Sequence, residues 1–241
     1  MFVKKDLRKI PVIFHDAMKT DKENQDDNTT DDKKAVGVPL TELRLARRPT
    51  EFKDGFEKVL CQPHYVPALR NLVSISLYDC QIRDLNGIGF FASQIDAIQK
   101  DDDNNNNTDD GNGDVKMDDV DSDSKDKRIF GGENSVCPNL EELNLGRNPL
   151  KNLPKELSLL SKSLKSLWLD DCELEGALPE CLYELENLTM LRISNNNITE
   201  LKDEGVGKWK KMEVLCLDGN KIETIPKAFM ELTKLKSLLL R

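Results

Sequence analysis

One spaced pattern of aliphatic residues returns along this chain with a nearly constant period. Each copy has apolar residues at its first, fourth, sixth and eleventh positions and a small polar residue at its ninth. Five copies begin at Leu72, Leu140, Leu164, Leu188 and Met212. From Leu140 onward the copies start 24, 24 and 24 residues apart, and a sixth copy, which begins at Leu235, follows after 23. A fixed period of this length is typical of a solenoid rather than of a closed globule.

Each position in the pattern has a physical role. The fourth and sixth positions alternate with polar neighbours, which predicts a short strand with one buried face. The ninth position holds a side chain that can bond backbone groups at a tight corner: Cys80, Asn148, Cys172, Asn196 and Asn220. After the corner, Pro154, Pro179 and Pro226 precede apolar residues three apart, which predicts a turn or helix on the opposite, convex side. No copy can bury its apolar edge alone, so the copies must stack.

These motifs resemble those of the leucine-rich repeat family. The motif that follows the corner resembles that of the intracellular Ras-group and plant Ras-group-related members. The resemblance implies an α/β solenoid, a right-handed superhelix with a concave parallel β-sheet and short helical or irregular convex segments. It covers residues 138–241 well and residues 40–90 loosely, with about seven strands when the copy at Leu40 and the truncated last copy are counted. One phrase, Leu-Glu-Gly-Ala-Leu-Pro at 174–179, resembles plant receptor-type repeats instead.

The repeat period also indicates the domain organisation. Leu72 and Leu140 are 68 residues apart, so about 44 residues are inserted beyond one period. Residues 101–127 contain eleven Asp and three Lys, a net charge of −8 against −9 for the whole chain. Such a tract is typical of a disordered surface loop, and neither Gly111 nor Gly113 completes a calcium-binding loop around it. We expect four segments: an extension and polar linker (1–37), irregular repeats (38–91), the acidic insertion (92–135) and regular repeats (136–241).

Several classes of function find no support in the residues. There is no secretory apolar segment and no run of about 18 apolar residues, which would span a membrane. The six cysteines lack paired spacings, which favours a reducing, cytoplasmic compartment. The sequence contains no phosphate-binding loop and no C-x-x-C or H-x-x-x-H metal-binding motif. The two histidines, His15 and His64, are not near a motif with a Cys or Ser nucleophile. We therefore expect no catalysis, no cofactor and no bound metal. No basic stripe interleaved with aromatics suggests nucleic acid.

The outward positions of the strands are therefore the candidate functional surface. We predict that a partner contacts the concave face through nine residues: Tyr78, Trp168, Asp170, Met190, Arg192, Val214, Cys216, Asp218 and Leu239. Trp168 is central, because exposed aromatic, Met and Arg side chains rimmed by carboxylates form typical hot spots of protein binding. The alternative is that Trp168 lies flat over neighbouring repeats and only covers the sheet.

The expected function is a non-catalytic interaction module of an intracellular signalling scaffold. The Ras-group resemblance implies small GTPases or phosphatase subunits as partners. The rival is a fragment of a receptor-type, ligand-sensing ectodomain, which glycans at Asn187 or Asn197 would favour, whereas free thiols would favour the cytoplasm. Because Leu235, Leu238 and Leu240 begin a copy that no cap completes before Arg241, we also expect a truncated product or an end covered by another chain, with self-association through that end.

Overall fold

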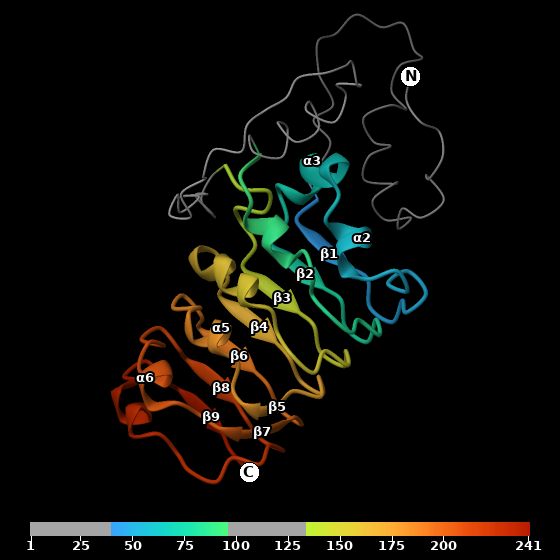
Figure 1. Ribbon diagram of the computed structural model, residues 1–241. Coiled ribbons are helices and arrows are strands. Elements are labelled where there is room, and N and C mark those ends of the chain that lie inside the picture. Colours follow the sequence, from blue (N-terminus) through green and yellow to red (C-terminus); the bar gives the residue numbers. More distant parts are fainter. Residues whose placement is uncertain (1–39, 96–133) are drawn as a thin grey trace, which may run out of the picture.

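The structure is a computed structural model that describes residues 40–95 and 134–241. Within these ranges, seven short strands form one parallel sheet and follow each other in chain order (Figure 1). They are β1 (Glu42–Arg44), β2 (Ser74–Ser76), β3 (Glu142–Asn144), β4 (Ser166–Trp168), β6 (Met190–Arg192), β8 (Val214–Cys216) and β9 (Ser237–Leu239). This is the predicted α/β solenoid, in which each turn of the chain adds one strand to the sheet.

The strand register follows directly from the repeat pattern. The residues at the fourth position of every copy are paired across the sheet in one row: Leu43, Ile75, Leu143, Leu167, Leu191, Leu215 and Leu238. All but Leu238 are 0% exposed. Burial of one such side chain stabilises the fold by roughly 1.5–3 kcal/mol. A slip of one residue would turn the whole row to solvent, so the apolar pattern fixes the register.

The ninth-position residues close the corners, as the sequence predicts. The side-chain oxygen of Asn196 accepts hydrogen bonds from the backbone N–H groups of Cys172 and Leu174, both at 3.0 Å. Its amide nitrogen donates to the carbonyls of Leu169 at 2.9 Å and Ile193 at 3.0 Å. One buried side chain thus satisfies backbone groups of two successive repeats where their strands end. At the corner of its own repeat, the Cys172 thiol donates to the Leu145 carbonyl at 3.3 Å.

Short helices line the side opposite the sheet. Among the described residues, the α-helices are α2 (Phe56–Leu60), α3 (Val66–Leu69), α5 (Glu180–Tyr183) and α6 (Asp203–Val206), and the 3-10 helices are η2 (Pro63–Tyr65), η3 (Ile88–Ala92), η4 (Lys155–Lys162) and η5 (Lys227–Glu231). As predicted, η4, α5 and η5 each begin directly after a proline. Trp209 is buried beside α5, where its indole N–H donates to the Leu182 carbonyl at 3.0 Å.

A second, two-stranded parallel sheet lies after the corners of the copies that begin at Leu164 and Leu188. It pairs β5 (Glu175–Ala177) with β7 (Asn197–Glu200). Beyond this sheet, the backbone N–H of Lys221 donates to the Ile198 carbonyl at 2.8 Å. The receptor-like phrase at 174–179 therefore forms a structure of its own within the solenoid.

The acidic insertion leaves and re-enters the solenoid at one point. Gln94 and Ser135 form an antiparallel bridge, and Val136 N–H donates to the Ser93 carbonyl at 3.0 Å. Ala92 and Ser135, the predicted ends of the insertion, are both buried, each 2% exposed. The tract 101–127, the extension 1–37 and His15 lie outside the described residues, so the segment boundaries remain predictions.

Candidate protein-binding surface

Eight of the nine predicted residues form one group on the sheet. We call the third, fifth, seventh and eighth positions of the copies the sheet face. Met190 and Val214 are paired at the third position, and the fifth position continues from Trp168 through Arg192 and Cys216 to Leu239. These residues lie on four neighbouring strands, which are about 4.8 Å apart. Asp170 and Asp218 belong to the same copies. Tyr78 stands apart, because β3 separates its copy from that of Trp168.

The apolar members of this group differ in exposure. Trp168, Met190 and Val214 are half-buried, and Leu239 is 47% exposed. We call these four residues the apolar patch. Half-burial fits both interpretations of Trp168, since an indole that rests partly on its neighbours still offers one side to a partner. An apolar patch that continues over several strands is more often a binding surface than scattered single residues are.

Cys216 does not contribute an accessible side chain, contrary to the sequence-based assignment. It occupies the outward fifth position but is only 4% exposed. In the ladder it stands between Arg192 and Leu239, which carry longer side chains. Residue alternation along a strand predicts the direction of a side chain, but the size of its neighbours decides whether solvent reaches it.

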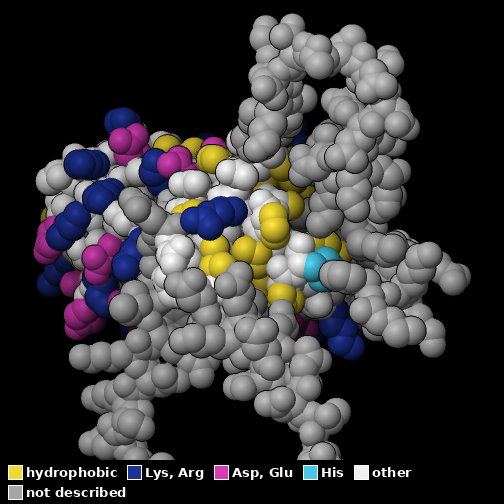
Figure 2. Space-filling view, turned by 90° about the horizontal axis from the view of Figure 1, so that it is seen from above, with side chains coloured by type: hydrophobic (Ala, Val, Ile, Leu, Met, Phe, Trp, Pro, Cys, Tyr) yellow, Lys and Arg dark blue, Asp and Glu magenta, His cyan; other side chains and the backbone are white. Residues whose placement is uncertain are grey.

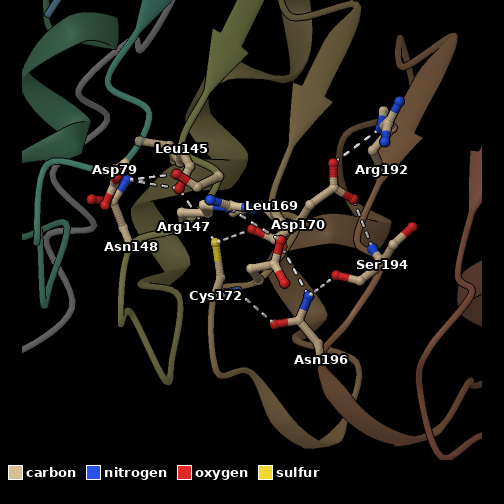
Figure 3. Close-up of polar contacts among 12 residues, drawn as sticks. Asp79, Leu145, Arg147, Asn148, Leu169, Asp170, Cys172, Arg192, Ser194 and Asn196 are labelled. Carbon is tan, nitrogen blue, oxygen red and sulfur yellow. Dashed lines mark hydrogen bonds and ion pairs between the residues drawn. The ribbon is translucent and has the colours of Figure 1, made fainter. Parts of the chain in front are cut away.

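A hydrogen-bonded network joins three successive copies beside the patch, and Figure 3 shows its part from Asp170 to Arg192 and Ser194. The Asp170 carboxylate accepts from Arg192 Nε at 3.0 Å and, through its other oxygen, from the backbone N–H of Ser194 at 2.9 Å. The Ser194 hydroxyl donates to the Asp218 carboxylate at 2.6 Å. The repeat pattern predicts that Asp170, Arg192 and Asp218 lie on this surface, but it does not indicate that Ser194 links them.

The repeat pattern did not predict a column of residues in left-handed backbone conformation, four of which are charged. From the copy at Leu40 to the copy at Met212, every eighth position has a positive φ: Arg47, Asp79, Arg147, Asp171, Asn195 and Gly219. Arg47 pairs with Asp79 at 3.9 Å and Arg147 with Asp171 at 3.8 Å. The Arg147 guanidinium also lies over the Tyr78 ring, 5.6 Å from its centroid. The alternation of Arg and Asp at this position was the available signal.

Lys and Arg side chains lie next to Asp and Glu side chains on the exposed parts of neighbouring copies. Figure 2 shows Lys and Arg side chains interspersed with Asp and Glu on the face seen from above, with apolar side chains gathered toward its centre. Neighbouring copies exchange ion pairs along the second position, for example Lys165 with Glu141 at 2.5 Å and Lys236 with Glu213 at 2.7 Å. Exposed pairs of this kind contribute about 0–1 kcal/mol each.

The six cysteines are free thiols. Burial raises the pKa of the Cys172 thiol to about 12 and that of Cys181 to about 11, and it raises the pKa values of Cys61 and Cys137 as well. A raised pKa keeps a thiol protonated and therefore unreactive at neutral pH.

We also searched the described residues for a metal site and for a helix that could span a membrane. In residues 40–95 and 134–241, no group of three or more His, Cys, Asp or Glu side chains is arranged to hold a metal ion. Nor does any helix in the described part of the chain combine the length and apolar character that a membrane crossing requires.

A solenoid of 24-residue turns with Asn or Cys corners and a parallel sheet defines a class of repeat protein, and comparisons with known proteins agree. Residues 186–241 and residues 163–185 each match a family described as leucine-rich repeat. Residues 163–241 therefore consist of leucine-rich repeats.

Two curated relatives match about two-fifths of the chain. A probable serine/threonine-protein kinase, pats1, from Dictyostelium discoideum is 41% identical over 104 residues, which are 42% of this chain and 3% of the relative. Osteomodulin from Bos taurus is 32% identical over 104 residues, 42% of this chain and 24% of the relative. The chain thus spans a small part of either relative.

Among solved structures, internalin C2 from Listeria monocytogenes shares the fold. It has a TM-score of 0.50 and 16% identity, and the match covers 86% of this chain and 63% of the internalin. At this identity the likeness concerns the fold alone.

Proposed function

We propose that this chain is a non-catalytic protein-interaction module of an intracellular signalling scaffold and that it binds its partner on the sheet face. The observation that carries the proposal is the apolar patch with Arg192 beside it on the same strands. Aromatic, Met and Arg side chains are enriched at the centres of protein interfaces. Leucine-rich repeats generally act as binding modules, which also supports a role without catalysis.

The proposed partners are small GTPases or phosphatase subunits, as the resemblance to Ras-group repeats implies. The likeness to a segment of a probable kinase supports a signalling context, although that segment is 3% of the relative. The six free thiols support a reducing compartment and hence the cytoplasm.

The test is an affinity pull-down with purified small GTPases, in their GDP and GTP states, and with purified phosphatase catalytic subunits. Trp168→Ala should weaken capture by about 2 kcal/mol or more, since truncated hot-spot residues lose that much. Met230→Ala is the matched control, because Met230 is 91% exposed on η5, away from the sheet face. Equal capture by the wild type and by Trp168→Ala would contradict binding on this face.

The receptor-type alternative is favoured by one feature, the second sheet formed at the receptor-like phrase. The two candidate glycosylation sites, Asn187 and Asn197, differ in how free their side chains are. The Asn187 amide donates to the carbonyls of Ser161 at 2.8 Å and Lys162 at 3.2 Å, whereas Asn197 is exposed and has no side-chain hydrogen bond to the described residues. A secreted form should therefore carry a glycan at Asn197 and not at Asn187. Mass spectrometry of the protein isolated from its native source is the test. A glycan at Asn197 would favour the ectodomain, and an unmodified Asn197 would favour the scaffold.

A further inference from the structure

Arg192 differs from the other charged residues around the apolar patch in the groups that it leaves unused. Its side chain is 46% exposed, and Nε makes its only side-chain hydrogen bond to the described residues, to Asp170. A guanidinium has five N–H donors in one plane. Four of them, on the two Nη atoms, are therefore free of protein partners in the described structure. Figure 3 shows the outer end of this guanidinium directed away from Asp170.

The side chain is also held in place before any partner arrives. The Asp170 carboxylate is only 18% exposed and is itself fixed by the backbone N–H of Ser194 at 2.9 Å. Long side chains lose considerable rotamer freedom when they bind, and a guanidinium that is already oriented loses less of it. Asp170 thus positions Arg192 and leaves its Nη edge available.

Apolar residues flank Arg192 in the sheet. Trp168 is the cross-strand partner of Arg192, Met190 lies two residues earlier on the same strand and face, and Val214 is paired with Met190. Both oxygens of Asp170 accept hydrogen bonds, from Arg192 and Ser194, and one oxygen of Asp218 accepts from the Ser194 hydroxyl. A ligand that approaches Trp168 and Met190 therefore meets one free set of charged donors.

We infer that Arg192 binds a carboxylate of the partner, on a segment that places an Asp or Glu side chain beside a large apolar residue. The two Nη atoms match the two oxygens of a carboxylate, and such bidentate pairs are among the strongest hydrogen bonds of proteins. The neighbouring apolar residue of the ligand lies on Trp168 and Met190. This inference rests on the proposed use of the sheet face and specifies the chemistry of the ligand.

The probe is a random peptide library displayed on phage and selected in parallel on the wild-type chain, on Arg192→Gln and on Arg70→Gln. Arg70 is an exposed arginine at the end of α3, away from the sheet, and controls for the loss of one positive charge. Peptides selected on the wild type and on Arg70→Gln should be enriched in an acidic residue next to an aromatic or aliphatic one. Peptides selected on Arg192→Gln should lack that acidic residue.

Fluorescence anisotropy with synthetic versions of the selected peptides then measures the coupling between Arg192 and the acidic residue of the peptide. Replacing the acidic residue of the peptide by its amide should raise Kd about tenfold or more for the wild type and leave Kd unchanged for Arg192→Gln. Arg192→Lys should recover only part of the affinity, because an ammonium lacks the planar fork.

The outcomes separate the two proposals. If Trp168→Ala abolishes peptide binding but the acidic residue shows no coupling to Arg192, the sheet face is a binding surface and the carboxylate site is wrong. If neither Trp168→Ala nor Arg192→Gln changes peptide binding, both the carboxylate site and the proposed binding on the sheet face are wrong. A wild-type selection that yields no peptide for the sheet face also overturns the carboxylate site.

Discussion

The side-chain oxygen of Asn148 accepts the backbone N–H of Cys80, 68 residues earlier in the chain, at 2.9 Å. The same oxygen accepts the N–H of Ile82 at 3.0 Å, and the amide nitrogen donates to the Leu77 carbonyl at 2.8 Å. One side chain therefore joins the two copies that the acidic insertion separates in sequence.

Asn148→Ala should lower the free energy of unfolding by about 2–4 kcal/mol, because it leaves buried N–H groups unpaired at the corner. Asn152→Ala, an exposed residue of the same copy, should change it by less than about 0.5 kcal/mol. Urea denaturation of both variants measures the difference. Equal stabilities would mean that water replaces the Asn148 contacts.

Deletion of residues 101–127 should leave the solenoid folded. The chain enters and leaves the insertion through the bridge between Gln94 and Ser135, which the deletion keeps. A charged, polar tract of this composition has little apolar surface to bury. The far-ultraviolet circular dichroism signal per folded repeat and the midpoint of thermal unfolding should both stay close to those of the full chain. Loss of the circular dichroism signal would show that the tract is part of the core.

Leu167 and its neighbour Trp168 should respond differently to truncation. Leu167→Ala should cost about 2–5 kcal/mol of stability, because Leu167 is 0% exposed and its removal opens a cavity. Trp168→Ala should cost less, since Trp168 is half-buried on the sheet face. Thermal unfolding of the two variants distinguishes an indole available to a partner from an indole that is needed to cover the sheet.

The buried thiols predict a loss of stability in alkali. Burial raises the pKa of Cys172 from 9.0 to about 12, so the folded state favours the protonated thiol. Its contribution to stability is complete below pH 9 and is lost as the pH rises from 9 toward 12, because the thiols of the unfolded chain ionise first. Cys172→Ala should flatten this part of the stability profile, measured by chemical denaturation at a series of pH values. An unchanged slope would assign the loss to other groups.

The last strand predicts the behaviour of a polypeptide made of these 241 residues. Leu238 is 39% exposed, although its counterparts in the other copies are fully buried, and β9 is an edge strand. Apolar side chains beside an open strand edge favour pairing with another chain. Sedimentation should therefore detect self-association at micromolar concentrations, and a polar-faced repeat appended after Arg241 should give a monomer. A stable monomer of the unmodified polypeptide would refute this.

The sequence does not correctly place the first helix of the described residues. From the sequence alone, Thr50 is a candidate cap for a helix that carries Phe52 and Phe56, but α2 begins after Gly55, whose φ of +96° only glycine adopts readily. Both phenylalanines are nevertheless buried, so the apolar spacing indicated which residues enter the core and not where the helix begins.

By itself, the sequence determined the repeat, the row of buried residues at the fourth position and the Asn or Cys corners. These features depend on spacing along the chain, which the sequence states outright. Only the tertiary structure decided that Ser194 fixes Asp170, that Asp170 positions Arg192 and that Cys216 is covered. Those relationships join residues 22–24 positions apart that become neighbours when the copies stack, and they depend on the size and rotamer of each side chain. Periodicity fixes which residues stand side by side, but packing decides which of their atoms stay free for a partner.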